Sequence, residues 1–263
     1  MNAVANFLHG LGSNTLAALR TSGHAALFVL DMLRALPAAL LRPGLILAQL
    51  YSLGNRSLMI IIASGLAVGL VLALQMYYAL APFGATGSLG LVVNLALVRE
   101  LAPVMAALLF AGRAGTSLTA EIGLMKAAEQ LLAMEVMAID PMARLLAPRF
   151  IAGVLSLPIL ASLFSAVGIG GAYVVAVELI GVDAGTFWST MQSGVDLARD
   201  VGSGLFKAAV FGVICMAVAL YQGFECEATP EGVAYATTRA VVNASLWVLG
   251  TDFVLTALLF STP

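Results

Sequence analysis

The longest stretch of this chain without a charged side chain runs from Ser57 to Val98. A helix rises about 1.5 Å per residue, so it needs about 20 mainly apolar residues to cross the hydrocarbon core of a bilayer. The stretch is therefore long enough for two crossings. Pro82, Gly84 and Gly87 indicate where the chain turns between them. A run of this length and composition predicts a hairpin of two transmembrane helices.

Composition extends this prediction to the whole chain. Hydrophobic residues make up 61% of the sequence and charged residues 10%, whereas a soluble domain is about 45–50% apolar and about 25% charged. With so few charges, most of the surface must face lipid. We therefore expect an all-α integral membrane protein that forms one domain with five transmembrane helices. Their expected bounds are residues 53–78, 88–112, 150–177, 203–223 and 239–260.

The segment 1–50 is expected to form interfacial helices that lie in the membrane surface and lead into the first span. Its polar residues recur at intervals of four and seven, which places a narrow polar stripe on an otherwise apolar, amphipathic helix. A helix packed against other protein remains an alternative. A cleaved signal peptide is not expected, because a basic start and a small-residue cleavage site are lacking. The stripe consists of His9, Ser13, Arg20, His24 and Asp31.

Basic residues predict the orientation, because they are enriched in cytoplasmic connections. Residues 178–202 form a mainly acidic connection and are expected in the periplasm. Lys207 lies just inside the fourth span and is expected to snorkel outward. The N-terminus is then cytoplasmic and the C-terminus periplasmic, as in a multi-pass protein of a bacterial inner membrane. Nine of the twelve basic residues lie on the expected cytoplasmic side: Arg20, Arg34, Arg42, Arg56, Arg113, Lys126, Arg144, Arg149 and Arg239.

Residues 113–149 form the longest and most charged connection on the expected cytoplasmic side, between the second and third spans. The part from about Thr119 to Ala138 has few helix breakers and predicts an exposed helix with an apolar stripe. Asp140 and Pro141 resemble an N-cap followed by proline at the first helical position. The stripe either packs on the spans or the bilayer surface, or docks a cytoplasmic partner. Beside it lie Glu121, Lys126, Glu129 and Glu135.

Three charged residues lie well inside the predicted spans, away from their ends: Arg99, Glu100 and Asp252. A charge near the bilayer centre costs several kcal/mol unless it is paired or hydrated, so each one is a functional hypothesis. Arg99 and Glu100 point about 100° apart on a helix, and Pro103 is expected to bend that helix into a cavity wall. The alternative is an internal salt bridge between two spans. For Asp252 a buried, hydrogen-bonded structural role is favoured.

The end of the first span combines large apolar groups with one amide, Gln75. Such a surface suits acyl chains, with a polar headgroup near Gln75, Arg99 and Glu100. An aromatic belt at the membrane interface explains Tyr77 and Tyr78 equally well.

Gly65 and Gly69 form a GxxxG motif in the same span. Small residues at this spacing let two helix backbones approach closely. The motif either packs within the fold or forms the seam of a homodimer.

Signals of catalysis and of metal or nucleic-acid binding are missing from the sequence. No G-x-x-x-x-G-K-[ST] phosphate loop and no G-x-S-x-G nucleophile elbow occur. Cys215 falls inside a span and Cys226 in a loop on the expected cytoplasmic side, so a disulfide is not expected, and without a nearby histidine neither is a metal site. We expect no catalytic residues, no cofactor and no nucleic-acid partner.

The sequence closely resembles the MlaE permease family over nearly its whole length. The resemblance is carried by LVRELAPVMAALLFAGRAGTSLTAEIGLMKAAEQLLAMEVMAIDP from Leu97 to Pro141, and by YSLGNRSL, SGLAVGLVLALQ, APRF and TTRAVVNASLWVLGTDFVLTAL. It implies the membrane subunit of an ABC-type system that moves phospholipids between the inner and outer membranes of Gram-negative bacteria, which maintains outer-membrane lipid asymmetry.

The resemblance also implies partners and sites. It implies a homodimer, a cytoplasmic MlaF-like ATPase that binds ATP, a periplasmic MlaD-like hexamer of MCE domains and a MlaB-like STAS-domain protein. The ATPase would dock on a coupling helix at about Ala120–Met137, which carries Glu121, Lys126, Glu129 and Glu135. Phospholipid would occupy a cavity between the two copies, lined by Leu72, Gln75, Leu80, Phe83, Arg99 and Glu100.

Two other functions remain open at this stage. The first is a membrane scaffold that anchors a periplasmic lipid carrier without moving lipid itself. The second, weaker one is a proton-coupled transporter that uses Glu100 and Asp252.

Overall fold

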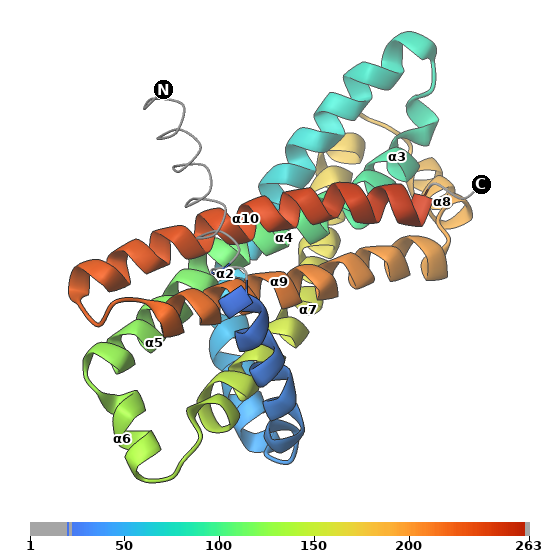
Figure 1. The fold of residues 1–263 in the computed structure, drawn as a ribbon. Helices are drawn as coiled ribbons and strands as arrows, with labels where there is room; N and C mark the ends of the chain where they lie inside the picture. Colours follow the sequence, from blue (N-terminus) through green and yellow to red (C-terminus); the bar gives the residue numbers. More distant parts are fainter. Residues whose placement is uncertain (1–19, 21–22, 261–263) are drawn as a thin grey trace, which may run out of the picture.

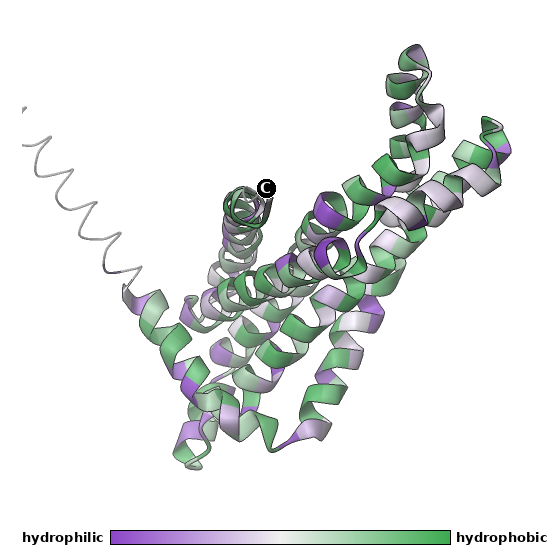
Figure 2. Cartoon of the chain, turned by 90° about the vertical axis from the view of Figure 1, so that its right-hand side faces the viewer, coloured by the Kyte–Doolittle hydropathy of each residue, from purple (hydrophilic) through white to green (hydrophobic). Residues whose placement is uncertain are grey.

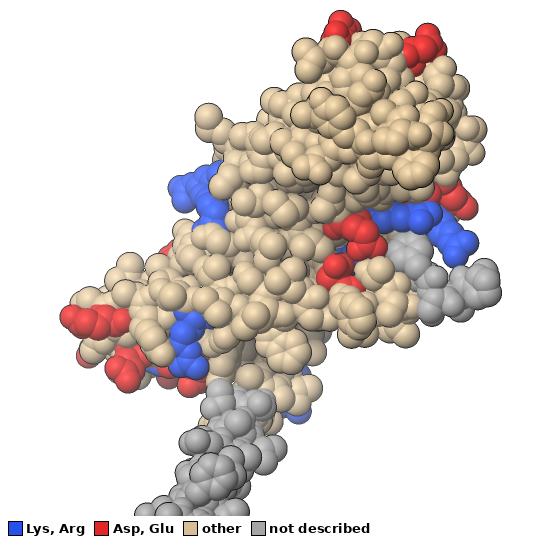
Figure 3. Space-filling view, turned by 90° about the horizontal axis from the view of Figure 1, so that it is seen from above, with Lys and Arg blue, Asp and Glu red and all other residues tan. Residues whose placement is uncertain are grey.

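The structure, a computed structural model, describes residue 20 and residues 23–260; His9 and Ser13 of the predicted N-terminal stripe lie outside these residues. The described part of the chain is helical, with short connections and no strand (Figure 1). The predicted all-α class is therefore confirmed. A broad uncharged surface, with charged side chains in a few small groups, is visible in Figure 3.

Within the described residues, six helices are long and apolar enough to cross a membrane. Five of them contain the predicted spans. The sixth falls in the segment that we expected to lie in the membrane surface, and its interfacial placement stays a prediction. The six are Gly23–Leu40, Pro43–Phe83, Thr86–Ala127, Met142–Leu179, Leu197–Glu225 and Pro230–Leu259.

Several of these long helices contain π-helical turns, and two short 3-10 turns join the first and second predicted spans. The α-helices are α2 (Pro43–Leu80), α3 (Leu89–Ala96), α4 (Ala102–Phe110), α5 (Thr116–Ala127), α6 (Gln130–Val136), α7 (Ala147–Tyr173), α8 (Ala184–Gly194), α9 (Gly202–Glu225) and α10 (Pro230–Phe260). The 3-10 turns are η1 (Ala81–Phe83) and η2 (Thr86–Ser88). The π-helical turns are η3 (Leu97–Leu101), η4 (Ala111–Gly115), η5 (Met142–Leu146), η6 (Val174–Leu179) and η7 (Leu197–Val201).

The bundle has two distinct ends (Figure 1). One end, called the α6 end below, holds α6, the start of α2 and the start of α10. The other, called the α8 end, holds the turns η1 and η2, α8 and the end of α10. The helices that contain α4 and α9 both run from the α8 end to the α6 end, whereas α2, α7 and α10 run the opposite way.

Glycines let α2 and α7 pack at close range. A Cβ atom on Gly69 would lie 2.0 Å from the carbonyl oxygen of Gly168, and one on Gly65 would lie 3.0 Å from that of Phe164. Gly171 of α7 meets the α2 backbone in the same way, with Leu66 O 2.9 Å from the position of a Cβ atom. The GxxxG motif therefore packs within the fold, which confirms that alternative.

The core centres on α9, whose buried side chains include Phe211, Cys215 and Met216. By contrast, α10 is the least buried of the six long helices and packs on α9, α5 and α4. Green, hydrophobic residues surround most helices in Figure 2. The large apolar side chains that α10 exposes include Tyr235, Val242, Leu246, Trp247 and Phe253. Lipid or another protein surface must cover this face in a membrane.

The predicted coupling region is divided in the structure. The helix of the second span continues through η4 into α5. Glu129, with φ of 57°, interrupts the helix between α5 and α6. The continuous helix expected from Thr119 to Ala138 is therefore two helices. Ala138, also at φ 57°, ends α6 in a Schellman motif in which the N–H of Ile139 donates to Met134 O.

Two aspartates cap helix starts in the segments between the spans. The cap at Asp140 was predicted, and the one at Asp183 was not. Asp140 Oδ1 accepts from the N–H of Met142 at 2.9 Å, so the predicted helix start at Asp140 and Pro141 is confirmed. Asp183 caps α8 by accepting from the N–H of Thr186 at 2.7 Å. The hydrogen bonds from the backbone and side chain of Thr186 lower the pKa of Asp183 below its ordinary value. The expected periplasmic connection, residues 178–202, thus contains the ordered helix α8.

We expect Gly69→Ala to destabilise the protein, because its new methyl group would collide with the backbone of Gly168. Overpacking of this kind costs about 1–3 kcal/mol, and it should lower the midpoint of thermal unfolding in detergent. Gly170→Ala is the control, since a Cβ atom there meets nothing within 4 Å. Equal midpoints for the two variants would contradict the close packing of α2 on α7.

Candidate functional site

Pro103 shapes the backbone around the adjacent charges Arg99 and Glu100. In a regular helix the N–H of residue 103 would donate to the carbonyl of Arg99, but proline has no N–H. The preceding turn η3 is π-helical, and the N–H of Ala102 donates to Leu97 O. Such π-turns inside α-helices frequently occur at functional sites. The neighbouring side chains of Arg99 and Glu100 reach separate partners on other elements.

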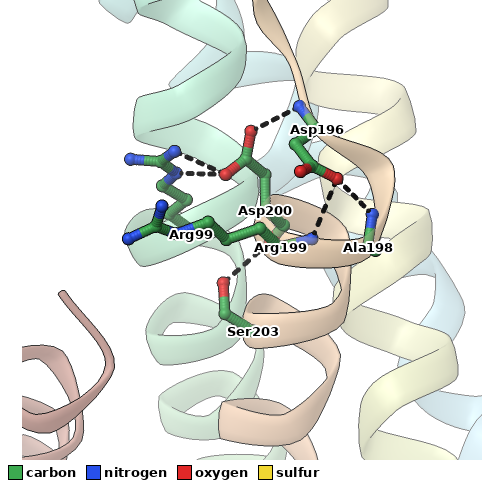
Figure 4. A network of polar contacts seen from close by, with 6 residues as sticks. All are labelled: Arg99, Asp196, Ala198, Arg199, Asp200 and Ser203. Atoms are coloured by element: carbon green, nitrogen blue, oxygen red, sulfur yellow. Dashed lines mark hydrogen bonds and ion pairs between the residues drawn. The ribbon is translucent and has the colours of Figure 1, made fainter. Parts of the chain in front are cut away.

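Arg99 pairs with Asp200 of η7 (Figure 4). Its Nε donates to Asp200 Oδ1 at 2.9 Å, and Nη2 donates to the same oxygen. The other oxygen of Asp200 accepts from the N–H of Asp196 at 2.9 Å. The Asp200 side chain is 1% exposed and that of Arg99 is 31% exposed. The pair therefore joins the second and fourth spans while part of Arg99 stays accessible.

A second basic residue lies beside this pair. Arg199 is exposed, and its guanidinium points to the same side of the network as that of Arg99 (Figure 4). Its N–H donates to Asp196 Oδ1, which also accepts from the N–H of Ala198. The start of η7 is thus capped by Asp196, and this cap fixes the backbone from which Arg199 and Asp200 project.

Lys207 of α9 connects three spans. Its Nζ lies 2.6 Å from Glu100 Oε2, 2.6 Å from Thr256 Oγ1 and 3.2 Å from Asp252 Oδ1. Glu100 Oε2 also accepts from the Thr256 hydroxyl at 3.2 Å. These contacts link the second span through Glu100, the fourth through Lys207, and α10 through the other two residues.

The prediction that Lys207 snorkels outward is wrong. Its side chain is 0% exposed, because Glu100 and Asp252 supply the opposite charge inside the bundle and remove the need to reach water. Asp252 is partly buried, as expected for a structural role. Its charged partner, which was not predicted, is Lys207. The alternative of an internal salt bridge is confirmed for both Arg99 and Glu100.

The other residues predicted to bind lipid lie at the end of the first span. Leu72 and Gln75 line a surface pocket of 410 Å³ on α2, which does not include Arg99 or Glu100. Leu80 is partly buried where α2 ends, and Phe83 is 83% exposed. Leu72 and Gln75 thus lie together in one surface pocket. Arg99 and Glu100 are neighbours in η3, outside that pocket. One cavity for all six residues stays a prediction.

The four residues predicted to couple to an ATPase fall into two groups. Glu121 Oε1 accepts from Arg149 at 2.6 Å, and Lys126 Nζ donates to Phe224 O at 2.7 Å. A cation suits this position, because Phe224 belongs to the last turn of α9, where the helix dipole is negative. These contacts tie α5 to α7 and α9. Glu129 and Glu135 are exposed at the α6 end.

Sequence reasoning missed Lys207, Asp200, Arg199 and Thr256 as members of this site. A signal for Lys207 was present, because the second and fourth spans begin at the same end of the bundle. Glu100 lies 14 residues after the start of the helix Thr86–Ala127, and Lys207 lies 10 residues after the start of Leu197–Glu225, so the two charges lie at a similar depth. Since a charge in a span needs a partner, Lys207 was the natural partner for Glu100.

We expect Lys207→Met to destabilise the protein by about 3–5 kcal/mol, because it leaves the carboxylates of Glu100 and Asp252 uncompensated inside the bundle. Adding Glu100→Gln and Asp252→Asn should restore most of the loss. Thermal unfolding in detergent measures the difference. Lys126→Met, which removes a partly exposed lysine, is the control. A single variant no less stable than the triple variant would contradict the pairing.

Known membrane proteins share much of this sequence. The family described as Permease MlaE matches residues 46–258. The intermembrane phospholipid transport system permease protein MlaE of Haemophilus influenzae is 49% identical over 98% of both chains. A probable ABC transporter permease protein of Rickettsia typhi is 36% identical over 97% of this chain and 98% of its own.

A more distant relative comes from a plant. The chloroplastic protein TRIGALACTOSYLDIACYLGLYCEROL 1 of Arabidopsis thaliana is 30% identical over 81% of this chain and 61% of its own length. The bacterial matches extend over nearly the whole of this chain, including η3, α9 and α10. This chain belongs to the MlaE permease family.

Proposed function

We propose that this chain is the membrane-spanning permease subunit of an ABC-type system that moves phospholipids between the inner and outer membranes and so maintains outer-membrane lipid asymmetry. The observation that carries the proposal is the charged network of Arg99, Glu100 and Lys207, partly exposed within otherwise apolar spans. The names of the Haemophilus influenzae and Rickettsia typhi relatives, a phospholipid transport permease and a probable ABC transporter permease, support it.

A phospholipid needs a cation near its phosphate and an apolar surface for its acyl chains. Arg99 and Arg199 direct two guanidinium groups to one side of the network, and arginine suits phosphate because its planar fork can bind two oxygens. Leu72, Leu80 and Phe83 supply apolar surface, with the amide of Gln75 among them. In the proposed pocket the headgroup lies near Arg99 and Glu100, and the chains lie against α2.

A second copy would complete this pocket. Within one chain, the hollow beside Leu72 and Gln75 is open on the surface of α2. The face of α10 exposes large apolar side chains such as Trp247 and Phe253. A homodimer would cover such surfaces and enclose lipid between the copies.

The source of energy is assigned to a separate subunit, because the sequence contains no nucleotide-binding motif. An MlaF-like ATPase would bind ATP and dock in the cytoplasm on α6, where Leu132, Val136 and Met137 are exposed. Our proposal places the α6 end and N-terminus in the cytoplasm, and the C-terminus in the periplasm of an inner-membrane protein. An MlaD-like hexamer would bind in the periplasm, and an MlaB-like STAS protein would join the ATPase. The chain itself is a transport subunit, with no catalytic residue and no cofactor.

We expect the double variant Arg99→Ala, Glu100→Ala to slow lipid transfer at least about tenfold, because loss of one charge-assisted contact is worth about 1.5–3 kcal/mol. Transfer is measured between donor and acceptor vesicles after reconstitution with the partner subunits. Arg199→Ala should also slow transfer but leave the contacts of Lys207 intact. The control is Asp31→Ala, Arg34→Ala, which removes an exposed pair at 3.1 Å.

The scaffold function predicts a different result. A scaffold would keep the periplasmic carrier bound and would support transfer at the parent rate when Arg99 and Glu100 are replaced. That outcome, with normal assembly and unfolding midpoint, would exclude the charged network from the path. Crosslinking of lipid to position 75 would argue against the scaffold, and transfer that persists without a proton gradient would exclude proton coupling.

We expect Leu132→Asp together with Val136→Asp to abolish recovery of the ATPase with this chain, because the two charges would disrupt an apolar contact. Val136 is 80% exposed, so the substitutions should leave the unfolding midpoint unchanged. Leu41→Asp is the control, since Leu41 is 84% exposed near the start of α2. Full recovery of the ATPase with the α6 variant would contradict docking on α6.

A further inference from the structure

A second, separate cavity lies between the second, third and fourth spans, and its lining includes Val98 and Val201, the sequence neighbours of Arg99 and Asp200 in the charged network. Its volume is 560 Å³, within the range of about 300–1,000 Å³ of small-molecule sites. Its lining comes from α7, from η3 and η7, from the beginning of α9, and from α8, which contributes Met191 and Gln192. None of the six residues assigned to the phospholipid pocket lines it.

One side chain in this cavity lacks a partner. Asn94 of α3 lines the cavity and is only 6% exposed. Its Oδ1 atom is buried and has no hydrogen-bond partner among the described residues. Leaving a buried acceptor without a partner costs about 1–3 kcal/mol, so a ligand that supplies a donor would be stabilised at this amide.

Besides the amide of Gln192, which can donate and accept, the cavity wall carries two serine hydroxyls that act as acceptors. Ser162 donates its hydroxyl to Pro158 O at 2.8 Å, and Ser165 donates to Ala161 O at 3.1 Å. Each hydroxyl has then used its only proton and retains lone pairs. Together with Asn94, these serines favour a ligand that carries a hydrogen-bond donor.

The mouth of the cavity opens on the apolar flank of the bundle. Ser162 and Ala166 are exposed on α7, and Leu205 of α9 is 39% exposed. These residues lie well inside membrane-spanning helices, where lipid is the surrounding medium. Apart from Gln192, the remaining wall is apolar and includes Ala161, Ile169, Val195 and Val201. A ligand would therefore enter from the bilayer and bury a hydrocarbon chain.

We propose that this cavity binds a single-chain amphiphile with a free hydroxyl beside its chain, of the lysophospholipid class. A diacyl phospholipid offers only acceptors at its two ester linkages, whereas a lysophospholipid has one free hydroxyl in place of an ester. This hydroxyl donates to Asn94 Oδ1 and can accept from its Nδ2. The chain lies between α7 and α9. The site is independent of the proposed transport function, because it shares no residue with that pocket.

The test uses the purified full chain in vesicles of diacyl phosphatidylcholine. The probe is lysophosphatidylcholine with a photoactivatable diazirine in its acyl chain, and the matched probe carries a methyl ether in place of the free hydroxyl. Crosslinked peptides are mapped by mass spectrometry. We expect saturable labelling of residues 161–169 and 191–205 by the hydroxyl probe, with about tenfold weaker binding of the ether, the size of one hydrogen bond.

Variants assign the contacts. Asn94→Leu should weaken binding of the hydroxyl probe about tenfold and leave the ether probe unchanged. Ala166→Phe should fill the mouth and abolish labelling by both probes. The matched control is Ile159→Phe, since Ile159 is 58% exposed on α7 and does not line the cavity. Comparison of the two probes on the unmodified protein keeps the test valid if a variant fails to fold.

Three outcomes would overturn the proposal. Equal binding of the hydroxyl and ether probes would remove the role of Asn94. Labelling that spreads evenly over α7 and survives Ala166→Phe would show bulk lipid contact only. Crosslinks from position 166 to another protein in the assembled complex, with no lipid adduct there, would assign the cavity to a partner helix.

Discussion

Every charge placed in a hydrocarbon environment needs an opposite charge or water, and this requirement organises the centre of the bundle. Lys207 is fully buried, and Glu100 and Asp252 surround it from two other spans. Arg99 and Asp200 form a second pair one residue away along the second span. Removal of any one partner leaves another charge unpaired in the apolar interior. Which helices lie next to one another at this level therefore depends on charge pairing as well as on packing.

Backbone irregularities allow these pairs to form. Pro103 deprives Arg99 of a regular helical hydrogen bond, and the π-turn η3 follows from this local loss. The turn lets two adjacent side chains reach Asp200 and Lys207 on different parts of the fourth span. Glycines act elsewhere by letting backbones approach each other. Gly69 and Gly168 bring α2 and α7 closer than any residue with a side chain would permit. Departures from ideal helices thus occur where polar partners or backbones must meet.

Much of this architecture could be predicted from the sequence, because long apolar runs and basic connections carry strong signals. The five spans and the helix start at Asp140 follow from local rules. The partner of a buried charge depends on the order of helices in space, so Lys207 was misjudged. The break at Glu129 was also invisible, since nothing in its local sequence demands a left-handed residue. A cavity between copies depends on a second chain and lies beyond what one sequence pattern specifies.

The attachment of α10 has a mechanical consequence. This helix is the least buried of the long helices, yet Asp252 and Thr256 place it in contact with the ammonium group of Lys207. Hydrogen bonds act over short distances, so a small outward movement of α10 must break these contacts together, in addition to its packing on α9, α5 and α4. Separation of α10 from the bundle would therefore cost the pairing of two side chains with one buried ammonium group at the same time.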